Sequence, residues 1–139
     1  MSKEVICMNN HICRAKSLDT GEWVYGYYVS KTDPLLDCTY HYILSQEYND
    51  NTGLLNSFMT WREVDPSTVC RYTGQEDVNG TSIFEHDILH GVYYHMFEDI
   101  NTFEVCWDKY VGGFGINTFE PTKCKILGNI FDNTELMIS

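Results

Sequence analysis

The sequence predicts a mainly β protein with little helix, built as a small barrel or a curled sheet. It contains 10 Tyr, 7 Phe and 3 Trp among 139 residues, and aromatic residues favour the pleated, half-buried surface of a strand. Runs of β-branched and aromatic residues recur between turn signals. No segment shows a sustained apolar stripe at the 3.6-residue helical period. Several short strands at such spacing are typical of a barrel or a curled sheet.

The first strong strand signal lies at 23–29, where only Gly26 is neither aromatic nor β-branched. Gly91 interrupts a longer apolar run and predicts a bend or bulge there. The segment 54–62 is short and is compatible with one or two helical turns. The remaining predicted strands are 40–44, 69–73, 82–84, 87–97, 102–107, 113–118 and 123–131.

Turn residues separate these strands. Asn79-Gly80 lies between 69–73 and 82–84 and predicts a hairpin, because both residues tolerate a positive φ. The Asn- and Asp-rich stretch 47–56 is the best candidate for a mobile loop. We therefore expect a single domain over 1–139, with an appended β-ribbon or an irregular arm or loop at about 45–62.

Composition excludes several classes of protein. Lys and Arg number 9 against 20 Asp and Glu, a net charge of −11 that opposes direct binding to nucleic acid. No stretch approaches the roughly 18 apolar residues that a membrane span needs, and the N-terminal residues lack the pattern of a secretory signal. The six cysteines therefore read as reduced thiols in a cytosol.

The acidic residues are concentrated in one segment. Between Tyr72 and Asp108 there are eight Asp and Glu residues and no Lys or Arg. Such a segment is either a solvated surface that aids solubility or a docking face for a basic partner. The candidate partner-binding residues are Glu85, Asp87, Glu98, Asp99, Glu104 and Asp108.

Other chemical constellations are weaker. Glu85 and Asp87 lie two apart and would share one face of a strand, which suits acid–base work or a cation, but we favour a structural role. The histidines His86, His90 and His95 could form a metal site, but separate, partly exposed histidines are the better interpretation. The elements of a zinc site occur in Cys7, His11, Cys13, Cys38 and His41, without a second complete ligand pair. We expect no catalytic residue, cofactor or metal.

Exposed aromatic side chains could also provide a stacking platform for bases. The candidates are Trp23, Tyr25, Tyr27, Tyr93, Tyr94 and Trp107. No basic residue accompanies those in the acidic segment, so we favour packing in a core or a subunit interface.

Three blocks of sequence resemble the YopX family of phages, prophages and mobile elements. They are 21–27 (GEWVYGY), 64–88 with VDPSTV, RYTG, NG and IFEHDI, and 126–136 with ILGNIFDN and EL. Arg14 and Lys16 match the usual N-terminal basic motif of the family. The resemblance implies a mainly β fold with a small SH3-like barrel and a tendency to form homo-oligomers, and it implies no chemistry. His86 and Ala15 stand where the family usually has Gly, and Thr134 stands where it has Pro. A side chain at 86 excludes a Gly-only backbone geometry unless the turn has rearranged.

Three hypotheses about function follow, in order of preference. The first is a non-catalytic interaction protein in the cytoplasm of a bacterial host, which uses its acidic segment against a basic host or phage protein. In its sharper form it inhibits a host defence or nucleic-acid-processing protein. The second is a β-barrel oligomer that binds a small molecule or nucleotide. The third is a metal-dependent enzyme that uses the region from Glu85 to Asp99.

Overall fold

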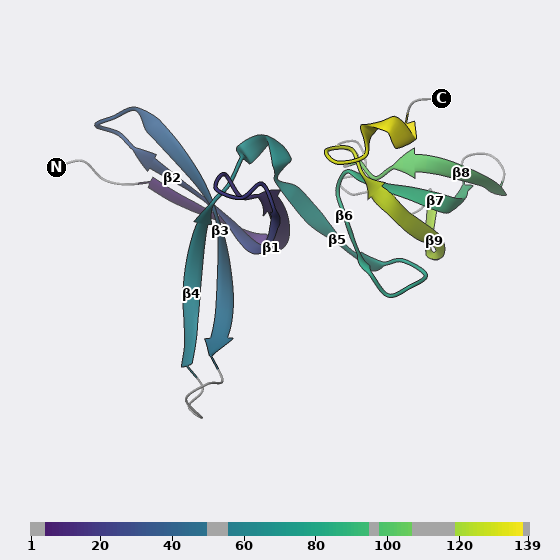
Figure 1. Cartoon of the computed structure of the whole chain (residues 1–139), viewed down its shortest axis with the longest axis horizontal. Coiled ribbons are helices and arrows are strands. Elements are labelled where there is room, and N and C mark those ends of the chain that lie inside the picture. Colours follow the sequence, from purple (N-terminus) through teal and green to yellow (C-terminus); the bar gives the residue numbers. More distant parts are fainter. Residues whose placement is uncertain (1–4, 50–55, 95–97, 107–118, 138–139) are drawn as a thin grey trace. The chain divides into compact units, whose positions relative to one another are not determined.

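The computed structural model describes residues 5–49, 56–94, 98–106 and 119–137. They are mainly β, as the sequence predicts, with two short 3-10 helices (Figure 1). The elements are β1 (Val5–Lys16), β2 (Trp23–Asp33), β3 (Cys38–Asn49), β4 (Asn56–Glu63), η2 (Pro66–Thr68), β5 (Cys70–Glu76), β6 (Ser82–Phe84), β7 (Asp87–Tyr94), β8 (Glu98–Glu104), β9 (Phe119–Asn129) and η4 (Thr134–Met137).

The strands form two antiparallel sheets. One has the order β4-β3-β2-β1-β5-β6 and the other the order β8-β7-β9. Among the described strands neither sheet closes on itself, so the barrel alternative is wrong and open sheets take its place. The chain also divides into two compact units, Met1–Arg71 and Tyr72–Ser139.

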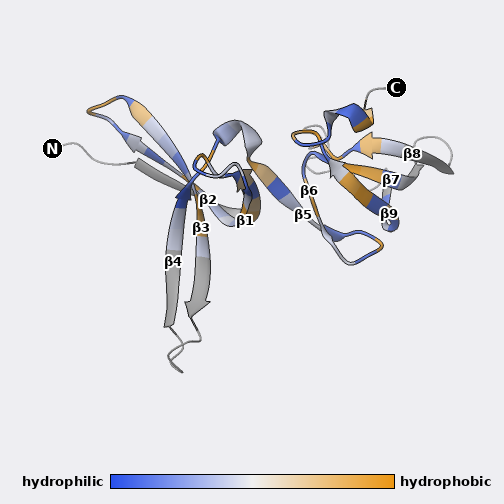
Figure 2. Ribbon diagram, viewed as in Figure 1, coloured by the Kyte–Doolittle hydropathy of each residue, from blue (hydrophilic) through white to orange (hydrophobic). Residues whose placement is uncertain are grey.

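Each unit has its own apolar core. The core of the first unit is made of Cys13, Ala15, Ile43 and Val64, with Val24, Tyr28 and Val69 packed against it. The core of the second unit is made of Ile83, Leu89, Val105 and Cys124, with Phe103 and Ile126 packed against it. Figure 2 shows hydrophobic stretches along β7 and β9, which contribute Leu89 and Cys124 to this second core. Three cysteines that the sequence assigns to a reduced core, Cys13, Cys70 and Cys124, are buried thiols that are not joined in disulfides.

Two strands escaped the sequence analysis. In β1 the apolar alternation is interrupted by Asn9, Asn10 and His11, where the pairing with β2 shifts register between Met8 and Ile12. Segment 54–62, read as possible helical turns, is mostly β4, so that expectation is wrong. The segment alone does not distinguish a helix from a strand, because strand formation depends strongly on context. Here the context is the pairing with β3.

The region expected to be an irregular arm is partly a regular ribbon. β3 pairs with β4 from Tyr42 opposite Glu63 to Asn49 opposite Asn56, and the two strands lie side by side in Figure 1. Residues 47–49 and 56, which the sequence placed in a mobile loop, therefore belong to strands. Residues 50–55 lie outside the described chain.

The predicted hairpin between β5 and β6 is confirmed, but its turn differs from the expected type. Of the two apex residues only Gly80 has a positive φ, of 79°, and its N–H donates to the Asp77 carbonyl at 3.0 Å. This arrangement fits a three-residue loop with glycine in the left-handed position. The Asp77 carboxylate favours it, because it accepts from Asn79 N and Thr81 N, both at 2.9 Å.

Candidate functional site

Two of the eight acids in the 72–108 segment are structural. Asp77 is buried and accepts hydrogen bonds from the backbone N–H groups of Asn79, Thr81 and Ile126. Burial alone would raise the pKa of its carboxyl, but these three amides and the charge of Lys125 outweigh it and hold the pKa below its ordinary value. Asp77 therefore ties the β5–β6 turn to β9.

Asp87 has a similar structural role. Asp87 is 2% exposed, and its carboxylate accepts a hydrogen bond from Phe84 N at 2.8 Å. Its backbone carbonyl accepts one from Val105 N at 2.9 Å. A carboxylate enclosed in this way cannot contribute to a docking face. The sequence-based assignment of Asp87 to a partner-binding surface is therefore corrected here.

Glu85 and Glu104, in contrast, reach the same part of the surface. Glu85 precedes β7, and Glu104 ends β8 opposite Ile88 of β7. Both carboxylates are partly exposed, and both act on the thiol of Cys106. Desolvation, then the charge and hydrogen bond of Glu104, then the charge of Glu85 raise the pKa of that thiol to about 11. We call Glu85, His86, Glu104 and Cys106 the acidic cluster.

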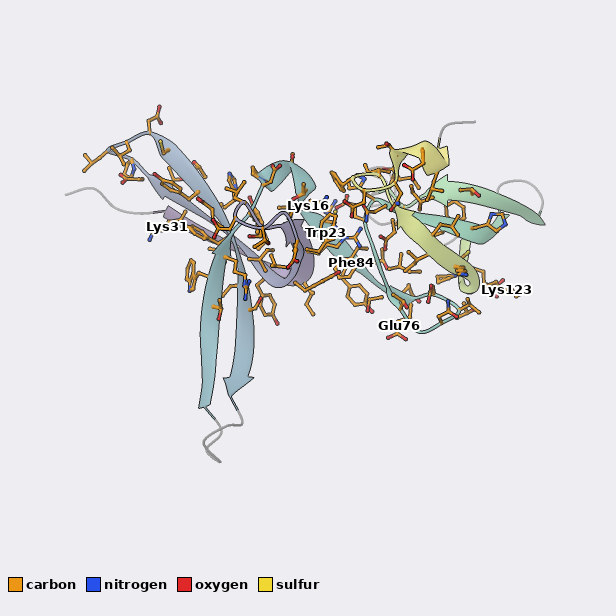
Figure 3. The ribbon with its side chains drawn as sticks, in the orientation of Figure 1. Lys16, Trp23, Lys31, Glu76, Phe84 and Lys123 are labelled. Atoms are coloured by element: carbon orange, nitrogen blue, oxygen red, sulfur yellow. The ribbon has the colours of Figure 1, made fainter. Side chains whose placement is uncertain are left out.

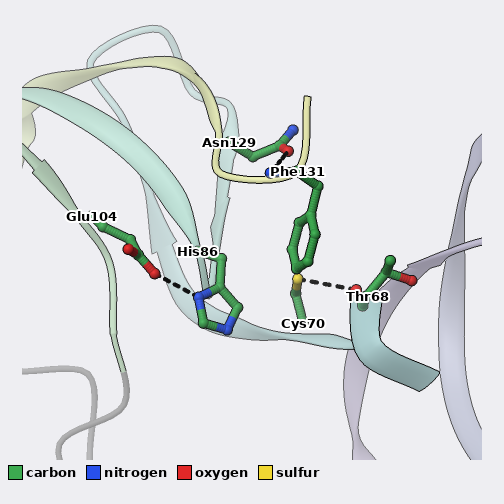
Figure 4. A network of polar contacts seen from close by, with 6 residues as sticks. All are labelled: Thr68, Cys70, His86, Glu104, Asn129 and Phe131. Carbon is green, nitrogen blue, oxygen red and sulfur yellow. Dashed lines mark hydrogen bonds and ion pairs between the residues drawn. The ribbon is translucent and has the colours of Figure 1, made fainter. Parts of the chain in front are cut away.

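His86 connects the acidic cluster to the fold. Its Nδ1 lies 2.7 Å from Oε2 of Glu104 (Figure 4), a contact that becomes an ion pair when the ring is protonated. The edge of its ring meets the ring of Phe131, with 5.8 Å between centroids. The backbone N–H of His86 donates to Val105 O at 2.7 Å, and its backbone carbonyl accepts from Ile130 N at 3.1 Å. His86 thus joins the ends of three strands.

The backbone of His86 has a φ of 70°. This is the left-handed region that glycine enters freely and that costs other residues roughly 1–2 kcal/mol. His86 thus adopts a left-handed conformation that glycine favours but that a residue with a side chain can also enter. The contacts of the ring and of the backbone hold the residue in this conformation.

A family model described as "YopX protein" matches residues 13–138. The chain belongs to the YopX family. The match spans both compact units. No curated protein and no solved structure matches the chain.

The departure from the YopX pattern at position 86 leads to a stability prediction. His86→Ala keeps the left-handed backbone and loses the contacts with Glu104 and Phe131, so we expect a loss of about 1–2 kcal/mol. His86→Gly loses the same contacts but relieves the strain, so it should lie within about 1 kcal/mol of the parent. Urea unfolding of the three proteins tests this order. An Ala variant more stable than the Gly variant would contradict the strain assignment.

The other predicted partner-binding acids lie outside the description of side chains. Glu98 and Asp99 occupy β8, paired with Tyr94 and Tyr93 of β7, and nothing further is described for their carboxylates. Asp108 and His95 lie outside the described residues. His90 is exposed, and its Nδ1 lies 2.8 Å from Oγ1 of Thr102.

The candidate metal ligands do not assemble in the described part of the YopX domain. There, no group of three His, Cys, Asp or Glu residues is arranged to hold a metal ion. Cys13 is enclosed in the first core, Cys38 is exposed at the β2–β3 end, and His41 is hydrogen-bonded to the hydroxyl of Tyr28. The side chains of Cys7 and His11 are not among those described. In the same described ranges no helix is long and apolar enough to span a bilayer.

Both residues of the basic motif in the YopX pattern lie close to a tryptophan. The Arg14 guanidinium carbon lies 4.6 Å from the centroid of the Trp23 ring. Lys16 Nζ lies 5.4 Å from the same centroid, and Figure 3 labels Lys16 and Trp23. These are cation–π distances. The Trp23 ring therefore contacts cations of its own chain.

Sequence reasoning missed an apolar row on the sheet of the first unit. The register aligns Ile12, Tyr27, Leu44 and Trp61 across four neighbouring strands. Leu44 is buried, while Ile12, Tyr27 and Trp61 are 45%, 40% and 46% exposed. We call these four residues the apolar row. The sequence gives no direct sign of it, because the row exists only once the strand register is known.

Proposed function

We propose that this YopX-family protein is a non-catalytic interaction module that binds a Lys- and Arg-rich partner through its acidic cluster. It would act in the cytoplasm of a bacterial host, in its sharper form as an inhibitor of a host defence or nucleic-acid-processing protein. The observation that carries the proposal is that the charges of Glu85 and Glu104 both act on the thiol of Cys106. The segment from Tyr72 to Asp108 contains eight Asp and Glu residues and no Lys or Arg.

The electrostatics of the acidic cluster support a role in recognition. Like charges on one surface raise the local concentration of an oppositely charged partner and speed its association. They also suppress the binding of acidic competitors, so that specificity and association rate change more than affinity. The net charge of −11 adds a long-range attraction for a basic protein, which salt screens over about 8 Å at physiological ionic strength.

The state of the Cys106 thiol supports a non-catalytic role. A nucleophilic cysteine needs a lowered pKa or an adjacent base that removes its proton. Burial and the negative charges of Glu104 and Glu85 instead raise the pKa of Cys106 to about 11. The thiol is therefore protonated near neutral pH and is a poor nucleophile.

Charge reversal tests the proposed function. We expect the parent protein to retain a basic protein from a host lysate, and the double variant Glu85→Lys, Glu104→Lys to lose it. The matched control is Asp19→Lys, Glu22→Lys, which reverses two exposed acids of the first unit and should retain the same protein. Equal retention by both double variants would contradict a role for the acidic cluster.

Self-association is a second candidate function, favoured by the apolar row. Ile, Tyr and Trp are anchor residues of protein interfaces, and Tyr and Trp are enriched among the residues that dominate binding energy. Three of the four residues in the row are substantially exposed on a preformed sheet. We propose that the exposed row lies beside a contact with a second protein chain, and that this chain is another copy of the same protein.

A further inference from the structure

We infer that two copies of the chain associate edge to edge through β4, so that their sheets become continuous. The inference rests on the proposed self-association and names the surface that mediates it. β4 is the terminal strand in the order β4-β3-β2-β1-β5-β6, so no described strand pairs with its outer edge. Exposed edges present rows of N–H and C=O groups that can pair with another strand.

The register shows which groups of β4 face outward. Val64 N donates to His41 O at 2.9 Å, so residue 64 points its backbone groups toward β3. In an antiparallel ladder this direction alternates along the strand, and no register shift interrupts the β3–β4 pairing. The backbone groups of Ser57, Met59 and Trp61 therefore point away from β3.

At the Glu63 end of β4, the outer edge already pairs with residues of the same chain. Leu18 N donates to Glu63 O at 3.0 Å, and Ser17 forms a bridge with Val64. The Glu63 bond confirms that odd-numbered residues of β4 face outward. Pairing from Trp61 to the free end of the strand remains open among the described residues.

The sequence of β4 lacks the usual protection of an edge. Natural edge strands carry Lys, Pro or inward charges that block pairing with other chains, but Asn56 to Trp61 contains no charged residue and no proline. The chain as a whole carries a net charge of −11. Two copies repel each other least where acids are absent, so this uncharged edge is electrostatically suited to a second copy.

An antiparallel pair of identical β4 strands satisfies the outward groups of both copies. With Met59 opposite Met59 of the second copy, Ser57 of each chain lies opposite Trp61 of the other. All three outward residues then form hydrogen-bonded pairs across the interface, and a two-fold axis relates the two copies. Such an isologous interface is expected of a dimer. The axis is perpendicular to the sheet, so the apolar rows of the two copies lie on the same face, with Trp61 of each copy beside Ser57 of the other.

The ribbon also gains stability from such pairing. β2 pairs with β3 only from Cys38 to Leu44, so Ser45–Asn49 and their partners Asn56–Thr60 form a two-stranded ribbon beyond that point. An isolated two-stranded ribbon is marginally stable in water. The second copy supplies a third and a fourth strand to it.

Adjacent proline substitutions test the proposed edge. Met59→Pro removes an outward N–H and should leave the pairing with β3 intact, whereas Phe58→Pro removes an N–H that points toward β3. We expect light scattering at about 100 µM to give a dimer or a multiple of it for the parent protein. Met59→Pro should give the 16.2 kDa monomer with an unchanged circular dichroism spectrum, and Phe58→Pro should lose β signal.

Hydrogen exchange of the unmodified chain keeps the test decisive if the proline variants fail to fold. The amides of Ser57, Met59 and Trp61 should be protected in concentrated samples and lose that protection on dilution. A folded Met59→Pro with the parent mass, or unprotected alternate amides in an oligomer, overturns the β4 edge but leaves self-association standing. A parent that is monomeric at every concentration overturns both. Protection that appears only with a different protein overturns the second copy as the occupant.

Discussion

Replacing Gly91 with alanine is expected to destabilise the second unit by about 3 kcal/mol or more. A Cβ on Gly91 would lie 2.6 Å from Cα and 2.8 Å from Sγ of Cys124, and closer still to the carbonyl oxygen of Lys123. Two of these atoms belong to the β9 backbone. Relief of this clash therefore requires β7 and β9 to move apart at Gly91, which pairs with Cys124. Because Cys124 belongs to the second core, this movement would disturb that core.

The measurement is urea unfolding followed by tryptophan fluorescence and circular dichroism. Cys124→Ala in the same chain is the control, because it removes the sulfur but leaves the backbone clash. The double variant Gly91→Ala, Cys124→Ala should be no more stable than Gly91→Ala. Full rescue by Cys124→Ala would show that the side chain, and not the close approach of β9, requires glycine.

Loss of the Asp77 carboxylate should have the second largest effect. Its two oxygens accept from Asn79 N and Thr81 N at 2.9 Å and from Ile126 N at 3.1 Å. Hydrogen bonds to a charged group contribute about 1.5–3 kcal/mol each and are not additive, so we expect Asp77→Ala to cost about 3 kcal/mol in total. Asp65→Ala, which removes an exposed acceptor for Ser67, should cost clearly less.

The same residue predicts a dependence on pH. The pKa of Asp77 is lower in the folded than in the unfolded chain, so its stabilisation is complete above the ordinary carboxyl pKa of about 4. It is lost as the pH falls through the lower, folded value. The difference in unfolding free energy between parent and Asp77→Asn should thus be constant from pH 7 to about pH 4 and shrink below it. A difference that grows on acidification would contradict the assignment.

Local signals predicted much of the fold correctly. The run at 23–29 and the turn at Gly80 report β2 and the β5–β6 hairpin directly, because side-chain type and turn chemistry act over a few residues. Gly91 was correctly expected at an irregularity, and the β7–β9 register shifts between Gly91 and Tyr93. β1 and β4 escaped because pairing with distant strands defines them.

The candidate site was predicted only in part. The charge asymmetry identified Glu85 and Glu104, but charge alone does not distinguish exposed acids from Asp77 and Asp87, which cap backbone amides. Burial depends on the tertiary fold. The apolar row and the open edge of β4 were not predicted either, since both follow from register. The single domain over 1–139 stays a prediction.

The association rate with an identified partner, measured by stopped flow across a range of salt concentrations, tests the proposed function most directly. We predict that the rate for the parent falls about tenfold or more from low to high salt, because steering by charge is screened. Glu85→Lys, Glu104→Lys should start near the high-salt rate and show little salt dependence, while Asp19→Lys, Glu22→Lys should follow the parent. Identical salt dependence for all three proteins would contradict a docking role for the acidic cluster.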